Sequence, residues 1–503
     1  LKFSSSEKAI INLELENYLS KRIIEPTDHS EGEFLSFIFT RPKKNGGLRI
    51  ILNLSVLNKF IKYEHFKMET FSVALSLIEE NCFMASIDLK DAYYSVPISK
   101  KFRKFLRFEW EGKLYQFTCF PNGLACAPRF FTKLLKPIFS YLRSHGFESI
   151  YYLDDTLLSG ENYEECARNV DATRGIMEYA GFTINCEKSV LIPCQKICFL
   201  GFEIDSKEMS VTLPLDKVES IKVFCSKLLS VKNIKIRSLA SFIGSIIAAT
   251  PASMYGSLYC NYLEIEKIKA LRMNNGNFEA HTVLNEHARS EILWWQNNID
   301  TCSKFIKLPP ISIVMFSDAS SLGWGVVYND VHVGGRWTLE ERSLHINVLE
   351  LRSMKFALKC LVNAGDMSHV NHIRFRSDSS TAVSYLNNMG GTRSIPCLKE
   401  AKDIWELAIK HKLWLSAEHI PGINNSEADR ESRVFHDDTE WVLQEHLFNV
   451  VVEYLGLPEI DLFASRLNAK VKKYVSWRVD PEAEFINAFS RTWENLFFYA
   501  FPF

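Results

Sequence analysis

Two adjacent carboxylates, Asp154 and Asp155, stand in the middle of an apolar stretch, 150–158. A polar pair between two short apolar segments predicts a hairpin whose turn holds both side chains above a sheet. Successive side chains of extended backbone point to opposite faces, so we expect only one of the pair, Asp154, to be a full metal ligand. A third carboxylate, Asp88, ends a further predicted strand, 83–87.

Three such carboxylates suit nucleotidyl transfer, which uses two metal ions about 4 Å apart, one at the primer hydroxyl and one at the triphosphate. Hard oxygen ligands favour Mg²⁺, with Mn²⁺ as a substitute. Each aspartate taken alone is more simply explained as a turn or cap residue. The neighbouring residues decide between the two interpretations.

Four segments around these aspartates resemble, in order and spacing, the palm motifs of reverse transcriptases. They are 86–93, 120–124 followed by 127–128, 152–155 and 199–201. The resemblance implies a right-hand polymerase with fingers, palm and thumb, in which Asp88, Asp154 and Asp155 are catalytic and bind metal. It also implies that Tyr93 abuts the 2′ position of the sugar. Finally, it implies a grip on the primer strand by Phe199, Leu200 and Gly201.

Residues 42–49 resemble the fingers segment that holds the incoming triphosphate in the same family. Cations over phosphates suit that role physically, and the segment supplies Lys43, Lys44 and Arg49. Whether Lys43 or Lys44 makes the contact stays open. The resemblance also implies that Asn122 and Gly123 lie at the nucleotide. Asn122 departs from the Gln or Phe that usually precedes this glycine in the family, so its own contact stays open.

A second set of acids follows after residue 310: Asp318, Glu350, Asp378 and Asp429. Four separated carboxylates can bind two metal ions for phosphodiester hydrolysis, although each alone would be explained as a cap. Their contexts, 317–320, 347–351, 377–380 and 419–429, resemble the ribonuclease H of retroelements. The resemblance implies that all four acids bind metal and are catalytic. His419 is a candidate general acid, but its place before the Pro-Gly turn favours a structural role.

The end of the chain resembles the region that follows ribonuclease H in DIRS-type retrotransposons, in the segments 460–468, 477–478, 480–483 and 499–502. The resemblance to retroelements therefore covers nearly the whole chain. DIRS-type elements are reported to integrate through a tyrosine recombinase, which, with a Gag-like protein, is an expected partner. Gypsy-type elements and pararetroviruses share both sets of motifs and stay as the alternative lineage.

The pattern along the chain predicts a multi-domain α+β protein. Fingers and palm occupy 1–213, a helical thumb or connection 214–310, a ribonuclease H-like mixed α/β domain 311–433, and an extension of unknown role 434–503. Within 311–433 we expect three strands, a helix with Glu350, a strand ending at Asp378, two helices, a strand and a last helix.

Two other stretches predict helices. The first is 7–19, near the start of the chain. The second is 238–263, which lacks charge and is long enough to raise the question of a membrane span. Pro251 and several polar residues interrupt it and favour a pair of buried helices instead.

The 503 residues carry a net charge of −1, with 47% hydrophobic and 13% aromatic residues. This composition predicts packed cores and excludes a disordered or uniformly basic chain. A nucleic-acid surface must therefore come from local basic runs, of which three stand out: 41–49, 100–107 and 466–478. The 12 cysteines form no zinc-binding pattern and are expected to be reduced core thiols of a cytoplasmic or nuclear protein.

Together these features predict an RNA-directed DNA polymerase with a ribonuclease H, which copies RNA into DNA and degrades the RNA strand of the hybrid. Its expected partners are an RNA template, a DNA primer, the RNA/DNA hybrid and deoxynucleoside triphosphates, with two Mg²⁺ ions at each site. Two alternatives stay open: a catalytically inactive, domesticated scaffold that binds nucleic acid, and a nuclease whose first half only clamps the substrate. The presence of every expected carboxylate argues against both.

Overall fold

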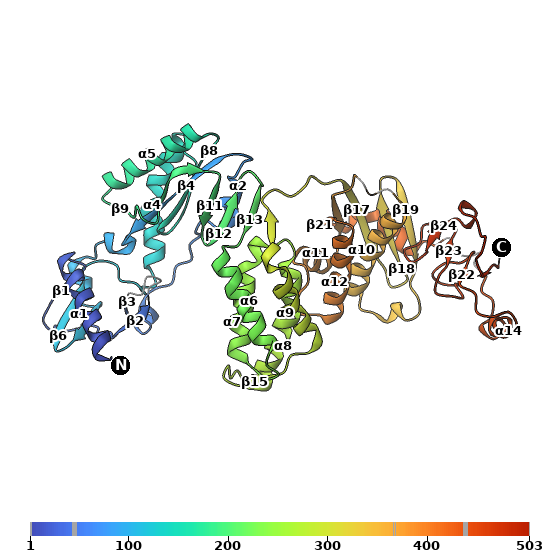
Figure 1. Ribbon diagram of the computed structural model, residues 1–503, viewed down its shortest axis with the longest axis horizontal. Helices are drawn as coiled ribbons and strands as arrows, with labels where there is room; N and C mark the ends of the chain where they lie inside the picture. The colour runs from blue at the N-terminus through green and yellow to red at the C-terminus, as the bar shows by residue number, and fades with distance from the viewer. Residues whose placement is uncertain (1–2, 43–47, 366, 368, 436–440, 502–503) are drawn as a thin grey trace. The chain divides into compact units, whose positions relative to one another are not determined.

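The computed structural model of the chain describes residues 3–42, 48–365, 367, 369–435 and 441–501 (Figure 1). The chain divides into two compact units. The first comprises Leu1–Pro214 with Ser303–Ile306, and the second comprises Leu215–Cys302 with Lys307–Phe503. The chain therefore leaves the first unit, returns to it for four residues, and enters the second again.

The first unit opens with helix α1 (Ser5–Ser20), which confirms the helix expected over 7–19. The Ser4 hydroxyl accepts a hydrogen bond from the Glu7 backbone, and the Glu7 carboxylate accepts one from the Ser4 backbone, so this capping box satisfies two donors of the helix start. The helix packs in one core with a hairpin and a three-stranded antiparallel sheet. The hairpin is β2 (Ile38–Pro42) and β3 (Leu48–Leu52), and the sheet has the order β1 (Ile24–Pro26), β6 (Lys113–Phe117), β5 (Arg107–Trp110).

The largest sheet of the first unit is built around β4 (Phe83–Lys90). Its order is β10 (Val190–Cys194), β4, β8 (Asp155–Gly160), β7 (Ser149–Tyr152), and β9 (Thr183–Ile184) pairs with the end of β4. Alternate residues of β4 enter two cores. Ala85, Ile87 and Leu89 pack with α4 (Ala127–Ser144) and α5 (Tyr163–Tyr179), whereas Met84 packs on the other face with α2 (Phe71–Ser76). Because side chains alternate along a strand, Asp88 shares the face of Met84.

A four-stranded antiparallel sheet completes the first unit. Its order is β11 (Lys196–Phe199), β12 (Phe202–Asp205), β13 (Ser210–Thr212), β16 (Ser303–Phe305). The last strand pairs with β13 after an excursion of the chain through the helices of the second unit.

The second unit begins with four helices, α6 (Leu215–Leu229), α7 (Ile236–Ala249), α8 (Asn261–Met273) and α9 (Glu286–Asn298). The uncharged stretch 238–263 is divided near Pro251 between the end of α7 and the start of α8, which confirms the expected pair of helices. Across the described ranges, no helix combines the length and the apolar character needed to cross a membrane. All twelve cysteines are free, and most are buried, whereas Cys186 and Cys198 are exposed.

A mixed five-stranded sheet follows in the order β19 (Val331–Arg336), β18 (Gly323–Tyr328), β17 (Ile313–Ala319), β20 (His372–Ser377), β21 (Trp414–His419). The first three strands are antiparallel, and β20 and β21 run parallel to β17. The helices are α10 (Ile346–Asn363), α11 (Ser380–Asn387), α12 (Ile395–Lys410) and α13 (Ser426–Arg433). This order of elements confirms the one predicted from the sequence.

Helix α13 lies directly on β18 and β19, where glycines make room for it. A Cβ at Gly325 would lie 2.1 Å from the Ala428 carbonyl oxygen, and one at Gly334 would lie 2.5 Å from that of Glu431. Trp324, the neighbour of Gly325, meets the ring of Phe356 on α10, with 5.3 Å between ring centroids. Since neighbouring strand residues point to opposite faces, α10 and α13 cover opposite faces of the sheet.

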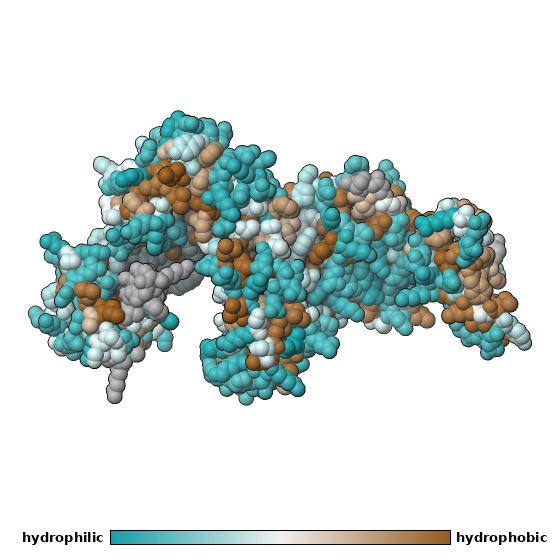
Figure 2. Space-filling model, viewed as in Figure 1, coloured by the Kyte–Doolittle hydropathy of each residue, from teal (hydrophilic) through white to brown (hydrophobic). Residues whose placement is uncertain are grey.

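The last part of the chain, 441–501, packs against the mixed sheet and α10; we call it the tail. It contains α14 (Glu445–Leu455) and two short strand pairs, β22 (Ile460–Asp461) with β25 (Phe498–Tyr499) and β23 (Val475–Ser476) with β24 (Phe485–Ile486). Arg466 joins the tail to the rest of the unit, because one of its guanidinium nitrogens lies 2.6 Å from the Glu341 carboxylate and another donates to the Arg336 carbonyl. Hydrophobic side chains gather on the exposed surface of α14 (Figure 2).

Candidate active sites

The β7–β8 hairpin places two aspartates beside the end of β4. Leu153 and Asp154 form its two-residue turn, in which Leu153 adopts the left-handed conformation with φ of 58°. Asp155 begins β8 directly opposite Asp88 of β4. Side chains of residues paired in this way lie about 5 Å apart at Cβ, so the Asp88 and Asp155 carboxylates are neighbours, while Asp154 is exposed at the hairpin tip. The register thus sets Asp155, rather than Asp154, against Asp88; which of the two is the full metal ligand stays a prediction.

The electrostatics of this cluster favour a bound cation. Burial raises the pKa of Asp155 to about 6, and the like charges of Asp154 and Asp88 add to the effect. Asn185 donates a hydrogen bond to one Asp88 oxygen at 2.9 Å, and Lys188 Nζ lies 3.7 Å from the other. Carboxylates that raise one another's pKa are typical of metal and catalytic sites.

Sequence reasoning missed Asn185 and Lys188. Both lie about a hundred residues after Asp88 and reach it only because β9 and β10 pair with β4. Neither stands in a motif that a local pattern would reveal. They act on Asp88 as a donor and a counter-charge.

Tyr93 lies close to the aspartates, in a short 3-10 helix, Ala92–Ser95, directly after β4. Its ring meets Phe131 edge-on, with centroids 5.5 Å apart, and this packing fixes the ring. Burial raises the pKa of Tyr93 to about 12, with a further contribution from the charge of Asp154. The aromatic ring therefore forms a fixed wall beside the carboxylates.

The other expected nucleotide-site residues have these positions. Asn122 donates a hydrogen bond to the Tyr94 hydroxyl at 3.0 Å. Two features favour glycine at position 123: its φ of 100° is left-handed, and a Cβ there would lie 3.2 Å from the Leu52 carbonyl oxygen. Leu200 and Gly201, with φ of 48° and 78°, are the two central residues of the β11–β12 hairpin, and two positive φ values are the mark of a type I′ turn. Phe199 is buried beside that turn.

The three cations expected at the triphosphate belong to the fingers segment. Lys43 and Lys44 lie outside the described residues, and Arg49 lies on β3.

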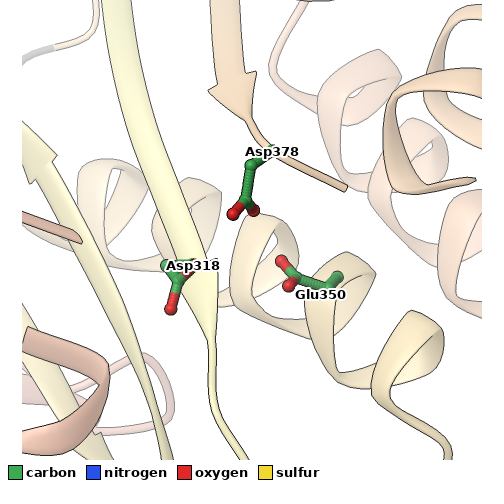
Figure 3. Close-up of side chains that lie close together, drawn as sticks. All are labelled: Asp318, Glu350 and Asp378. Atoms are coloured by element: carbon green, nitrogen blue, oxygen red, sulfur yellow. The ribbon is translucent and has the colours of Figure 1, made fainter. Parts of the chain in front are cut away.

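A second carboxylate cluster lies in the mixed sheet of the second unit. Asp318 is on β17, Asp378 directly follows the parallel neighbour β20, and Glu350 is on α10, which packs on β17 (Figure 3). One oxygen of each residue lies within 4.8 Å of the others. Within the described parts of the chain, no other group of three or more His, Cys, Asp or Glu side chains meets this limit.

Two of the three carboxylates of this second cluster are buried and short of hydrogen-bond donors, whereas Asp378 is exposed. Asp318 and Glu350 are 4% and 6% exposed, and burial, reinforced by the neighbouring carboxylates, raises the pKa of Glu350 to about 9 and that of Asp318 above its usual range. One oxygen of Asp318 and one of Glu350 have no hydrogen-bond partner in the described chain. Buried carboxylate oxygens without donors are costly, and a divalent cation would satisfy both.

The fourth acid of the sequence prediction, Asp429, is turned toward a different partner. It lies on α13, where Arg433 approaches it to 2.6 Å, and it is not part of the group of three. Its charge nevertheless contributes to the raised pKa of Asp318, which places it near the cluster. Asn425, which sequence reasoning missed, is buried and donates to the Ser317 carbonyl and, at 3.4 Å, to Asp318.

His419 lies at the edge of the cluster. Its Nε2 is 3.1 Å from the backbone carbonyl oxygen of Asp378, so the contact is with the main chain rather than with the carboxylate. Gly422, three residues later, lets the loop come close, since a Cβ there would lie 3.1 Å from an Asp378 carboxylate oxygen. The His419 contact therefore supports the backbone of Asp378, and the missing side chain of Gly422 leaves room for its carboxylate.

Comparison with known proteins relates part of the chain to a known family. Residues 41–204, which include the first cluster, match the family model for reverse transcriptase (RNA-dependent DNA polymerase). The Pro-Pol polyprotein of simian foamy virus type 1 is 25% identical over 301 residues, 58% of this chain and 24% of the relative. The transposon Tf2-3 polyprotein of Schizosaccharomyces pombe is 25% identical over 166 residues, 33% of this chain and 12% of the relative. The chain thus spans about a quarter or less of these curated relatives.

Solved structures extend the likeness to most of the chain. The foamy viral protease–reverse transcriptase in complex with RNA/DNA hybrid has a TM-score of 0.52 and 17% identity, and covers 88% of this chain and 56% of that chain. The same protein in complex with dsDNA has a TM-score of 0.52 and 18% identity, and covers 84% of each chain. Residues 41–204 are therefore a reverse transcriptase domain, carried within a mixed α+β multi-domain fold shared with the foamy viral protease–reverse transcriptase.

Proposed function

We propose that the chain is an RNA-directed DNA polymerase with a ribonuclease H, which copies retrotransposon RNA into DNA and degrades the RNA strand of the hybrid. The observation that carries the proposal is the presence of one carboxylate cluster in each unit. Asp88, Asp154 and Asp155 lie inside the segment that matches the reverse transcriptase family, and the second unit holds Asp318, Glu350 and Asp378. Because the clusters share no residue, the two reactions proceed at separate sites.

In the polymerase site, Asp88, Asp154 and Asp155 would hold the divalent ions, Mg²⁺ or Mn²⁺. The ions supply charge neutralisation and polarisation at the phosphates. A cation fits the raised pKa of Asp155, because it replaces the repulsion among the three carboxylates by attraction. The Tyr93 ring would limit the space beside the sugar of the incoming nucleotide.

Two other parts of the first unit complete the proposed polymerase site. The cations Lys43, Lys44 and Arg49 would hold the triphosphate, together with the segment of Asn122 and Gly123. The tight turn of Phe199, Leu200 and Gly201 would support the primer strand, since a type I′ hairpin is a rigid support. These roles follow from the family resemblance.

In the ribonuclease H site, Asp318, Glu350, Asp378 and Asp429 would hold the divalent ions. The unpartnered oxygens of Asp318 and Glu350 fit such ions, because oxygen ligands without hydrogen-bond donors are free to coordinate. To bind an ion, the Asp429 carboxylate would have to release the guanidinium of Arg433. His419 would act as a support for the Asp378 backbone.

The substrates and the lineage are part of the same proposal. Solved relatives are in complex with dsDNA and with RNA/DNA hybrid, and we propose that this chain binds the same nucleic acids and deoxynucleoside triphosphates. We also propose fingers and palm in 1–213, thumb or connection in 214–310, ribonuclease H in 311–433 and an extension in 434–503. The resemblance of the tail favours a DIRS-type element, with a tyrosine recombinase and a Gag-like protein as partners, over a Gypsy-type or pararetroviral lineage.

Primer extension on an RNA template and cleavage of the RNA strand of a hybrid, measured on one preparation, test the proposal. Asp155→Asn should remove synthesis and keep cleavage, and Asp378→Asn should do the reverse. Asp171→Asn, an exposed aspartate of α5, should keep both activities. Absence of both activities in the folded wild type would favour an inactive scaffold, and absence of extension alone would favour a nuclease with a clamp. Loss of both in one folded variant would contradict separate sites.

A further inference from the structure

The edge of β4 that faces β9 and β10 is interrupted at Asp88. β9 pairs with the residues after it, 89–90, and β10 pairs with residues before it, 84–86. In the described pairing of these strands, no residue stands opposite Asp88 on this edge, and the register of β10 shifts. The residues between the two strands, 185–189, form a turn that fills this gap; we call it the Asp88 turn. Irregular pairing of this kind is common beside active sites, where it re-aims a side chain.

The Asp88 turn takes over hydrogen bonds that a paired strand would make. The Asn185 backbone N–H donates to the Asp88 carbonyl at 2.8 Å, and the Asp88 N–H donates to the Ser189 hydroxyl at 3.0 Å. That hydroxyl donates to the Asn185 carbonyl at 2.8 Å, and so do the backbone N–H groups of Lys188 and Ser189, at 3.2 and 3.0 Å. The turn is therefore closed on itself and bonded to the backbone of Asp88 on both sides of its Cα.

The side chain of Asn185 also contacts the Asp88 carboxylate. Its amide donates to one carboxylate oxygen at 2.9 Å. An ionised carboxylate can only accept, so the NH₂ group of the amide must be the part that faces it. The Asp88 side chain is only 14% exposed, so solvent contributes little to its orientation. A carboxylate held at one oxygen no longer rotates freely, and the hydrogen bond thus fixes which oxygen is left for a cation.

The second Asp88 oxygen faces a cation that can move away. Lys188 Nζ lies 3.7 Å from this oxygen, which is too far for a hydrogen bond, and the Lys188 side chain is 68% exposed. On the other edge of β4, Asp155 stands directly opposite Asp88. A divalent ion can therefore replace the ammonium group at the second oxygen, while the Asn185 amide stays on the first.

We propose that Asn185 is a positioning residue of the polymerase site, which holds Asp88 so that it binds an ion through a single oxygen. Ser189 assists by fixing the backbone of the same aspartate. Removal of a hydrogen-bond donor behind a ligating carboxylate typically changes metal affinity or activity by about 10- to 100-fold. The inference rests on the proposed function, because the metal-binding role of Asp88 is part of it.

The test compares substitutions in the full chain that affect two different amides. Asn185→Ala removes the contact with the Asp88 carboxylate. Asn162→Ala is the matched control, since the Asn162 side chain caps α5 in the same unit by accepting from the Glu165 N–H at 2.9 Å. Asn185→Gln keeps the amide on a longer side chain and should recover part of the effect. A purely structural role of Asn185 would make the two alanine variants alike.

Mn²⁺ binding gives a readout that needs no catalysis. Each variant is made in the Glu350→Gln chain, so that the second cluster contributes less, and bound Mn²⁺ is measured by electron paramagnetic resonance. Asn185→Ala should raise the dissociation constant by about 10- to 100-fold, and Asn162→Ala should leave it unchanged. Equal dissociation constants in the two variants would overturn the proposal.

Primer extension at varied Mg²⁺ concentration, with Glu350 intact, gives the second readout. The concentration for half-maximal extension should rise in Asn185→Ala by a similar factor, and kcat should recover at least in part at saturating Mg²⁺. Ser189→Ala should shift this midpoint in the same direction, and Ser189→Thr, which keeps the hydroxyl, should not. Hybrid cleavage should keep its Mg²⁺ dependence, because the second cluster lies in the other unit. Slower extension with an unchanged Mg²⁺ midpoint would contradict the positioning role.

The two readouts separate this inference from the proposed function. If the chain with Asn185 intact extends no primer while Mn²⁺ binding still falls in Asn185→Ala, the proposed polymerase fails and the positioning role stands. If it extends primers while both alanine variants keep the same Mn²⁺ binding and Mg²⁺ midpoint, the positioning role fails and the proposed function stands. Absence of both extension and Mn²⁺ binding would overturn both.

Discussion

The two carboxylate clusters differ in how much of their geometry exists before a cation binds. In the first, Asp154 is exposed at a hairpin tip, and Asp88 is held by Asn185 and Lys188. In the second, Asp318 and Glu350 are buried, their oxygens lie within 4.8 Å of each other and of Asp378, and two oxygens lack partners. Solvent and Lys188 weaken the repulsion among the carboxylates of the first cluster. The buried carboxylates of the second cluster are less screened by solvent.

Similar chemistry can therefore be coupled to stability to very different degrees. Like charges cost little where water screens them and much where they are buried. The cost appears as a moderate pKa shift in Asp155, to about 6, and a large one in Glu350, to about 9. We therefore expect the second cluster to be preformed and strained without metal, and the first to be completed only with its substrates.

The largest expected effect comes from Glu350→Gln. Cleavage of hybrid should fall by at least about a hundredfold, because a lost ligand forfeits several kcal/mol of charge stabilisation. The metal-free protein should nevertheless gain about 3 kcal/mol of stability at pH 7, since the wild-type carboxyl must take up a proton there. Cleavage assays and denaturant unfolding in chelator measure the two effects.

The free energy of unfolding should depend on pH through the raised pKa of Glu350. The folded pKa of Glu350 lies above its unfolded value of 4.5, so its contribution to stability is present below pH 4.5 and is lost as pH rises toward 9. The slope over this window should be shallower in Glu350→Gln. Glu406→Gln, an exposed position on α12, should keep the wild-type slope. Equal slopes in all three proteins would remove the basis for a strained second cluster.

Metal binding should stabilise the second unit more than the first. At a hundredfold excess of Mg²⁺ over the dissociation constant, a site gains about 2.7 kcal/mol. Calorimetry with and without Mg²⁺ should show this gain in the wild type and in Asp154→Asn, and little of it in Glu350→Gln. A larger loss in Asp154→Asn than in Glu350→Gln would reverse the comparison of the two clusters.

The polymerase site should be distinguished by a steric effect rather than by stability. Tyr93→Val should relax discrimination against ribonucleotides by roughly 1–3 kcal/mol, because it removes the fixed ring beside the aspartates. Single-nucleotide incorporation with ribo- and deoxynucleoside triphosphates measures the ratio. Tyr93→Phe keeps the ring and serves as the control. Unchanged discrimination in Tyr93→Val would count against the assignment of this wall.

The smallest effect concerns the fourth acid of the second cluster. Asp429 pairs with Arg433, and because both side chains are largely exposed the pair is worth only about 0.2–1 kcal/mol. Arg433→Gln should therefore lower the Mg²⁺ concentration for half-maximal cleavage by up to about fivefold and leave DNA synthesis unchanged. Arg430→Gln, at a neighbouring exposed arginine, is the control. A higher Mg²⁺ requirement in Arg433→Gln would show that this arginine assists the site instead of competing for Asp429.

Local patterns in the sequence were sufficient for the elements that carry the sites. The apolar residues around Asp154 and Asp155 predict the β7–β8 hairpin, and the alternation in 311–433 predicts the order in which strands and helices follow one another along that part of the chain. Helix α1 followed in the same way from its spacing. These features depend on residues a few positions apart, so a local pattern is enough to indicate them.

Other features depend on contacts that no local pattern contains. The pairing of β16 with β13 joins segments about ninety residues apart, and Asn185 reaches Asp88 from a similar distance in the sequence. The partner of Asp429, Arg433, was likewise absent from any sequence motif. Such arrangements depend on strand register and on packing between elements that are distant in the sequence.

Residue types and their spacing therefore identify which carboxylates are candidates and which strands and helices carry them. The packing of distant elements buries Asp318 and Glu350 beside the exposed Asp378, whereas it leaves Asp154 in solvent. The physical reason is that side-chain spacing sets the type of an element, whereas burial, and with it the electrostatic cost of gathering like charges, arises only when distant elements pack together.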